Sequence, residues 1–340
     1  MSKVRQSNIE LLRIILMLMI VINHIISHGV LDYNEIIGNT LIFYRMIIAF
    51  VVPAVISFVL ISGYFSIHGS LFWGGAKFWL QSMELLLVSI LISLFACHVV
   101  TMKDFALSIF SPVSESHGLW FIPAYFTLYC VSPFLNSWLN DVSKKKLAIA
   151  IVLLMSGLCS LGYLINMSFF SGIWLFVLLY MIGWWIKRYD VPLLSKLSIS
   201  KLIGVYVVLC LMNLLVYFLF QKYLPSINAY SYKNPITILS GIVLFLIFMN
   251  IKISFNKWIN VLAIGAFPVY ILHENVWMRS FWSNYVHNVY CKYSFLGLFL
   301  LILLMVPILY VLVTLAEKLR LLIHKKYLFP QLEKIKSLIK

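Results

Sequence analysis

The sequence predicts an all-α integral membrane protein with about ten transmembrane helices and both termini in the cytoplasm. Three observations support this fold class. Of the 340 residues, 63% are hydrophobic and 11% are charged, whereas a soluble domain is about half apolar and about one-quarter charged. Apolar runs recur along the whole chain, each near the roughly 17–25 residues that cross a hydrocarbon core. Lysine and arginine are concentrated in alternate connecting segments.

The apolar runs divide the chain into ten expected helices. The first is too long for a cleavable signal peptide, carries Arg13 in its body and lacks a small-residue cleavage site. The sixth and eighth are the shortest. Both are retained because losing either one would place the basic stretches "DVSKKK" and "KISFNK" on opposite sides of the membrane. The expected spans are residues 9–28, 40–62, 78–99, 119–139, 147–166, 172–186, 202–220, 235–251, 258–277 and 294–316.

The distribution of basic residues sets the expected orientation. With the N-terminus inside, 19 of the 26 lysines and arginines are cytoplasmic, five lie in outer loops, and Arg13 and Arg45 lie within spans. This bias follows the positive-inside rule, so the net charge of +15 indicates contact with anionic lipid rather than with nucleic acid. We expect one membrane domain at residues 1–316 and a basic amphipathic cytoplasmic tail at residues 317–340.

The five cysteines show no pattern that points to chemistry. They contain no CxxC pair and no spacing typical of metal ligands. We therefore expect them to be packing residues, and we expect neither a bound metal nor a permanently bound cofactor.

The first expected helix carries one polar stripe. Arg13 and His24 are eleven residues apart. In an α-helix this spacing places two side chains within about 20° of the same face and about 16 Å apart along the axis. Glu10 precedes Arg13 by one turn and His28 follows His24 by one turn. A structural interpretation pairs Arg13 with Glu10 near the membrane surface and bonds His24 to a neighbouring helix. A functional interpretation is that the stripe lines a cavity or a relay.

The functional interpretation predicts a ligand with an anionic end and a reactive group deep in the membrane. An acyl thioester of coenzyme A has this form, because its phosphates would stay near cytoplasmic arginines and lysines while its long arm reached along a channel. Arg13 would then bind the donor through its charged N–H groups. His24 would take the proton of an acceptor hydroxyl that attacks the thioester, a step for which a neutral imidazole is suited near pH 7.

At these residues the chain resembles the bacterial membrane acyltransferase 3 family. The signature of that family is an arginine, ten residues and a histidine in the first helix, here "RIILMLMIVINH", with an acidic residue three positions earlier, here Glu10. Three further stretches are similar to the family in the same order: "VLISGYF", "HGLWFIPAYFTLYCVSPFL" and "FPVYILHE". Many members have an arginine-rich run at the start of the third helix, whereas this chain has "FWGGAKFWLQSMELLL", with only Lys77.

The resemblance implies a membrane O-acyltransferase in the bacterial cytoplasmic membrane. The enzyme would move an acyl group, with acetyl expected, from cytoplasmic acyl-CoA to a hydroxyl of an envelope polysaccharide or a lipid-linked saccharide. His24 is the expected catalytic base, and Glu10 or Glu84 would orient the site. Arg13, Glu84 and Lys77 are the expected donor-binding residues.

Other polar residues at the outer ends of the spans are candidates for binding the acceptor. They stand at about the height of His24, where the acyl group and an acceptor sugar would meet. The candidates are His273, Tyr270, Glu274, Arg45, Trp120 and His117. Anchoring of helix ends at the interface is the alternative for Tyr270 and Arg45, and an aromatic belt is the alternative for Trp120. For Glu84, at the depth of Arg13, the alternative is a structural ion pair between helices.

A rival function belongs to another class. A multi-pass transporter or flippase for an anionic or saccharide substrate would also place charges inside the membrane. Transporters often contain internal repeats and broken helices, but the two halves of this chain show no repeat and few Gly/Pro interruptions. An enzyme that acylates a small molecule or a peptide stays open as a third possibility.

Overall fold

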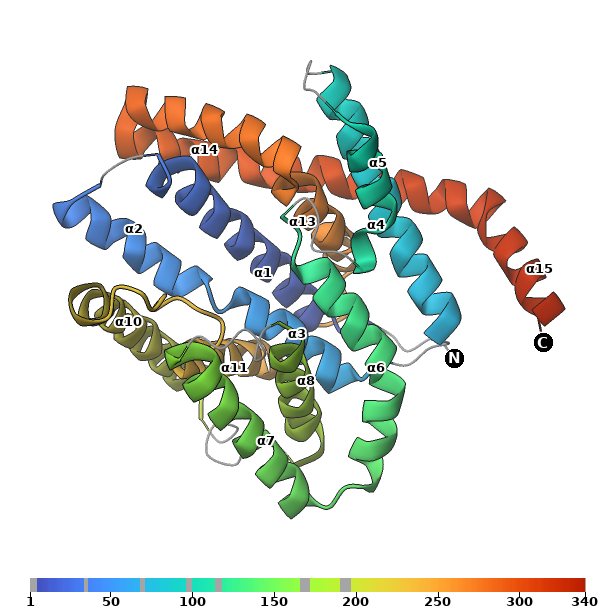
Figure 1. The fold of residues 1–340 in the computed structure, drawn as a ribbon, viewed down its shortest axis with the longest axis horizontal. Coiled ribbons are helices and arrows are strands. Elements are labelled where there is room, and N and C mark those ends of the chain that lie inside the picture. The colour runs from blue at the N-terminus through green and yellow to red at the C-terminus, as the bar shows by residue number, and fades with distance from the viewer. Residues whose placement is uncertain are drawn as a thin grey trace.

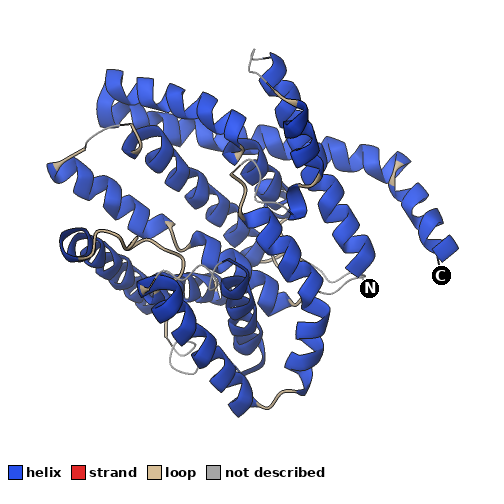
Figure 2. Cartoon of the chain, viewed as in Figure 1, coloured by secondary structure: helices blue, strands red, loops and turns tan. Residues whose placement is uncertain are grey.

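The computed structural model describes residues 5–33, 36–67, 71–95, 100–113, 118–165, 172–189 and 197–339. Within these residues the protein is built from helices and contains no strand (Figure 2). Six helical segments are long and apolar enough to cross a membrane: Ser7–Leu31, Gly38–Phe65, Trp73–Phe95, Lys144–Leu164, Ile199–Tyr223 and Val276–Tyr327. The predicted class, an all-α multi-pass membrane protein, is confirmed. The count of ten spans and the orientation of the termini stay predictions.

The first span lies in the middle of the bundle. Helix α1 (Ser7–Ile26) continues into a π-helical turn, η1 (Ser27–Leu31). Figure 1 shows α1 between α2 and α14, and it also packs on α3, α11 and α13. A π-helical turn re-aims the side chains that follow it and often occurs at functional sites. Here it carries His28.

The second predicted span is two helices rather than one. Helix α2 (Gly38–Val51) and helix α3 (Ala54–Phe65) are separated at Pro53. Proline has no N–H to continue the helix, and its ring clashes with the carbonyl one turn earlier. The break leaves α3 free to pack closely against α8 (Gly172–Tyr189).

The middle of the chain follows the predicted spans closely. Several of its helices begin at a side-chain cap, such as Asn234, which accepts a hydrogen bond from the N–H of Ile236 before Pro235 opens α11. The predicted ends at residues 99 and 166 lie outside the described residues. The elements are α4 (Leu71–Phe95), α5 (Met102–Ile109), η2 (Ser111–Val113), α6 (Phe121–Asp141), α7 (Lys144–Cys159), η3 (Ser160–Leu164), α10 (Ile199–Tyr223) and α11 (Pro235–Asn250).

The ninth predicted span is divided into three short pieces. These are α12 (Lys257–Leu262), η4 (Ala263–Gly265) and α13 (Ala266–Glu274). Gly265 permits a close approach to α14, since a Cβ on it would lie 2.0 Å from Oγ1 of Thr314. Asn275 ends α13 with an extended backbone and caps the next helix by accepting a hydrogen bond from the N–H of Met278.

The long helical element before the C-terminal helix contains a reversal of direction that the sequence did not indicate. Helix α14 (Val276–Tyr327) has a non-helical residue at Ser294, with φ 50° and ψ −141°. In Figure 1 the two halves of α14 lie beside one another and meet at the left edge. Residues 278–293 were expected to form an outer loop between the ninth and tenth spans. They are helical instead, and Val286 packs so closely on Gly29 that a Cβ there would lie 2.4 Å from its Cγ1.

The C-terminal part of α14 continues past the predicted domain boundary. The helix extends without a break from the tenth predicted span to Tyr327, and α15 (Phe329–Ile339) follows it. Residue 317, where the tail was expected to begin, lies inside this helix. The division into a membrane domain and a tail stays a prediction.

The contact between α3 and α8 yields a test of the fold. A Cβ on Gly183 would lie 2.4 Å from the carbonyl oxygen of Leu60, and Gly63 approaches the backbone of Tyr180 equally closely. We expect Gly183→Ala to force the helices apart and to destabilise the protein by about 1–3 kcal/mol. Thermal unfolding of the purified protein in detergent would measure this change.

Gly204 provides the matched control for this substitution. It lies within α10, and a Cβ on it would meet no atom within 4 Å. Gly204→Ala should leave the unfolding temperature unchanged or slightly higher, because alanine favours a helix over glycine. Equal unfolding temperatures for Gly183→Ala and the wild type would contradict the proposed backbone contact.

Candidate active site

One cavity of about 460 Å³ joins the two ends of the predicted polar stripe. Near the start of α1 it is lined by charged residues, among them Arg5, Glu10 and Arg13. Further along α1 it is lined by His24 and by aromatic residues from α6 and α13. The stripe therefore faces a cavity, as the functional interpretation predicted.

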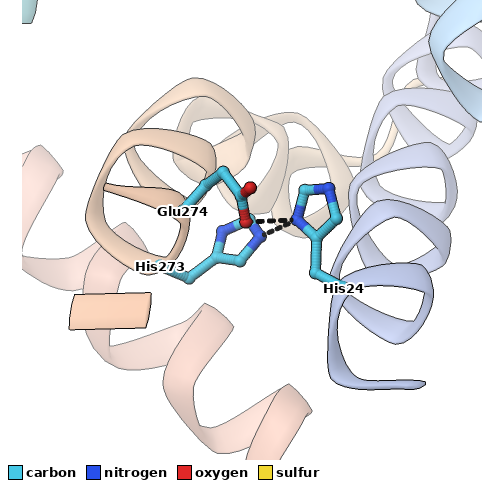
Figure 3. Close-up of side chains that lie close together, drawn as sticks. All are labelled: His24, His273 and Glu274. Carbon is cyan, nitrogen blue, oxygen red and sulfur yellow. Dashed lines mark hydrogen bonds and ion pairs between the residues drawn. The ribbon is translucent and has the colours of Figure 1, made fainter. Parts of the chain in front are cut away.

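His24 lies in a buried polar cluster where α1 meets the end of α13 (Figure 3). Its Nδ1 is 2.8 Å from Oε2 of Glu274 and 2.9 Å from Nε2 of His273. His273 and Glu274 are 5% and 6% exposed. His24 and His273 are 249 residues apart in sequence. Two distant parts of the chain thus meet at three polar side chains.

The hydrogen bonds define which ring nitrogens carry protons. Nδ1 of His273 lies 2.6 Å from the carbonyl oxygen of Val269. A carbonyl only accepts, so Nδ1 carries the proton and Nε2 of the neutral His273 ring accepts one from His24. Nδ1–H of His24 therefore donates to Nε2 of His273, and Oε2 of Glu274 lies at an ion-pair distance from the same Nδ1. Nε2 of a neutral His24 is then unprotonated, and in Figure 3 it points away from both partners.

A second layer of charged groups surrounds Glu274. Its Oε1 accepts a hydrogen bond from Nη1 of Arg279 at 3.2 Å and lies 3.6 Å from Nε2 of His28. Nδ1 of His28 lies 2.9 Å from a carboxylate oxygen of Asp32. Arg279 thus places a permanent positive charge beside the buried Glu274 carboxylate, which a carboxylate needs in a site of low polarity.

Backbone contacts hold the end of α13 in place. Nε1 of Trp282 donates a hydrogen bond to the carbonyl oxygen of His273 at 2.6 Å. Nδ2 of the buried Asn275 donates to Oγ of Ser89 at 3.0 Å, which ties the end of α13 to α4. These contacts fix the position of the two cluster residues that precede Asn275.

Aromatic side chains form the walls of the cavity near His24. Trp120 stacks on Tyr232 with ring centroids 5.4 Å apart, and Phe121 meets Tyr270 edge to face at 5.6 Å. The hydroxyl of Tyr125 pairs with Oγ of Ser62 at 3.1 Å. The chamber is mostly apolar, with a few polar atoms near the imidazole of His24.

The charged end of the cavity contains an ion-pair network that the sequence indicated only in part. Glu84 was expected at the depth of Arg13, but its Oε2 accepts a hydrogen bond from Nη1 of Arg320 at 2.6 Å. Arg320 also donates twice to Glu317, at 2.7 and 2.8 Å. Arg13 lies 3.5 Å from Glu10. Arg320 and Glu317 line the cavity with Arg13, and neither was predicted.

Other predicted site residues lie away from the cavity or outside the described part of the chain. The guanidinium of Arg45 lies over the ring of Tyr217 at 4.7 Å, and Nζ of Lys77 lies over the ring of Phe329 at 5.0 Å. Neither is among the residues that line the cavity. His117 lies outside the described residues. The structure thus brings His273, Glu274, Tyr270 and Trp120 to His24, but not Arg45 or Lys77.

The cluster at His24 is also a candidate for binding a metal ion. The ligand atoms of His24, His273 and Glu274 all lie within 4.8 Å of one another. Two of their separations, 2.8 and 2.9 Å, are hydrogen-bond distances. Zinc ligands lie about 2.0–2.2 Å from a tetrahedral ion, so they stand about 3.4 Å apart. The geometry fits a shared proton better than an ion, and the expectation of no metal stays a prediction.

Sequence reasoning missed three members of this site for identifiable reasons. Arg279 was assigned to an outer loop, and His28 was placed on the polar stripe but given no role in the site. Arg320 was placed in a lipid-bound tail, although Glu317 and Arg320 have the i,i+3 spacing of a helical ion pair. His28 lies in the π-helical turn, Arg279 lies in the first turn of α14 just after Asn275, and Arg320 follows the reversal at Ser294.

Comparison with known proteins identifies one family. The chain matches the acyltransferase 3 family, described as an acyltransferase domain, over residues 6–316. The matched range contains α1, α13 and most of the cavity wall. No curated protein and no solved structure matches the chain significantly.

Proposed function

Since the chain belongs to the acyltransferase 3 family, we propose that it transfers an acyl group, with acetyl expected, from cytoplasmic acyl-CoA to a saccharide hydroxyl. The acceptor is an envelope polysaccharide or a lipid-linked saccharide, and the enzyme works in the bacterial cytoplasmic membrane with both termini inside. One observation carries the proposal: a single cavity joins an arginine-lined end to His24. The family favours this acyltransferase over the predicted alternative, a transporter or flippase.

The charged end of the cavity suits the phosphates of coenzyme A. Three guanidinium groups reach it from separate places, on Arg5, Arg13 and Arg320. Guanidinium groups bind phosphate through paired, charge-assisted hydrogen bonds. Glu317 and Glu84 already pair with Arg320, so Arg5 and Arg13 are the candidates for the positive charge that the third helix provides in many relatives and that Lys77 does not bring to this cavity. The arm of the donor would then extend about 16 Å along α1 to His24.

His24 is positioned to act as the general base. Its Nε2 takes the proton of the acceptor hydroxyl while the hydroxyl oxygen forms a bond to the thioester carbonyl carbon. When the intermediate collapses, the C–S bond breaks and the proton passes from His24 to the departing sulfur. The carboxylate of Glu274, 2.8 Å from Nδ1 of His24, stabilises the imidazolium that forms in between. We therefore assign the orienting role to Glu274 and the positioning of Arg13 to Glu10.

The aromatic chamber suits a saccharide acceptor. Trp120 and Tyr232 present flat apolar surfaces next to the polar cluster. Such surfaces pack on the apolar face of a sugar ring, while a few polar groups fix the orientation of its hydroxyls. Tyr270 is a candidate for that polar role because it lines the cavity, whereas both ring nitrogens of His273 are already bonded within the protein.

The first test is the transfer of labelled acetyl from acetyl-CoA in membranes that contain the host glycan. The wild type should label the extracytoplasmic glycan, and His24→Ala should lower the rate by at least about 100-fold, because it removes the base. Protein levels and unfolding temperatures should match those of the wild type. Near-normal labelling by His24→Ala at matched expression would contradict the role of His24.

Glu274→Gln tests the partner of the base. Glutamine keeps the shape of the side chain but removes the charge that stabilises the imidazolium, so kcat should fall at least about 100-fold while the KM for the donor changes little. Asp32→Asn is the control, because Asp32 contacts His28 rather than His24. A Glu274→Gln enzyme as active as Asp32→Asn would show that the carboxylate charge is not used.

Arg13→Ala tests the donor end of the cavity. Loss of one charge-assisted contact should raise the KM for acetyl-CoA about 10-fold and leave kcat within about threefold of the wild type. Arg188→Ala is the control, because Arg188 is also a guanidinium but lies over the ring of Trp184, away from the cavity. Equal KM values for the two variants would place the phosphates elsewhere.

A further inference from the structure

Tyr270 has a buried hydroxyl that the fold does not use. The side chain lies on α13 three residues before His273, and it is only 7% exposed. Its Oη is buried and has no hydrogen-bond partner among the described residues. Leaving a buried hydroxyl unpaired costs free energy, and native proteins rarely do so without a reason. Tyr270 also lines the cavity that contains His24.

The ring of Tyr270 is held in a defined position. It meets the ring of Phe121 edge to face at 5.6 Å and the ring of His273 edge to face at 6.2 Å. Both contacts constrain the ring plane, and Tyr270 is part of the wall of the cavity that contains His24. A ligand group that enters the cavity is then the candidate acceptor for the hydroxyl proton.

We propose that Tyr270 donates a hydrogen bond to the carbonyl oxygen of the acyl thioester and stabilises the oxyanion that forms there; this inference rests on the proposed function. As the acceptor oxygen bonds to the carbonyl carbon, the π electron pair of the C=O bond moves onto its oxygen. Tyr270 faces that negative charge and keeps its own proton. The pair then re-forms the C=O bond, the C–S bond breaks, and His24 gives the proton to sulfur.

An unpaired donor is well suited to this role. A donor that already has a protein partner must break that bond before it can serve the transition state, as Tyr125 would have to do with Ser62. The hydroxyl proton of Tyr270 has no acceptor among the described residues, so no bond to that proton has to break. Preorganised donors of this kind act most strongly when charge develops on the reacting oxygen, so they affect kcat more than substrate binding.

Tyr270→Phe separates this role from a structural one. The substitution removes one oxygen atom and keeps the ring. Acetyl transfer should fall about 100- to 1,000-fold in kcat, with the KM for acetyl-CoA within about threefold of the wild type. The unfolding temperature should be equal or higher, because an unpaired buried hydroxyl has been removed. A loss of activity together with equal or higher stability is the expected signature.

Tyr163→Phe is the matched control. Tyr163 is also 7% exposed, its Oη is also buried and unpaired, and it lies in η3 away from the cavity. Tyr163→Phe should have an unfolding temperature equal to or higher than that of the wild type, and a normal kcat.

The outcomes distinguish this inference from the proposed function. If the wild type is active and Tyr270→Phe has a normal kcat, the inference about Tyr270 is wrong but the proposed function stands. The same holds if Tyr270→Phe loses activity together with a fall in unfolding temperature. A wild type that transfers no acyl group overturns the proposed function and the inference with it.

Discussion

The buried carboxylate of Glu274 sets the constraint on which the rest of this structure depends. A charge that is 6% exposed inside a helical bundle must have partners nearby. They come from three separate elements: His24 from α1, His28 from the π-helical turn and Arg279 from the first half of α14. The end of α13 at Asn275 and the turn η1 both bring side chains to this one group.

The cavity gives this charged cluster a chemical use. The base nitrogen of His24 is left free because its other nitrogen faces Glu274 and His273. The same helix leads back to an arginine-lined opening. A long donor with an anionic end can therefore be bound at one place and react at another. The chain belongs to an acyltransferase family, and the proposed reaction uses this separation of binding from reaction.

Sequence patterns predicted the elements that follow from one-dimensional rules. Apolar length identified most of the helices, and helical periodicity placed Arg13 and His24 on one face of α1, which does line a cavity. The positions of Arg279 and Arg320 could not be predicted, because they depend on the break between α13 and α14 at Asn275, on the reversal at Ser294 and on packing between helices far apart in sequence. Arg45 was expected near His24 from its depth alone, but depth does not specify direction around a helix. It faces Tyr217 instead.

The contact between α3 and α8 has a consequence for the width of the cavity. At Gly63 and Gly183 the two backbones touch without side chains between them, so no change of side chain can bring α3 closer to α8. The opposite face of α3 contributes Phe58 and Ile61 to the cavity wall. Residues on that face can change size while the wall behind them stays in place. The volume available to an acyl chain then depends on a few side chains. These side chains can differ between enzymes that share the same arrangement of helices.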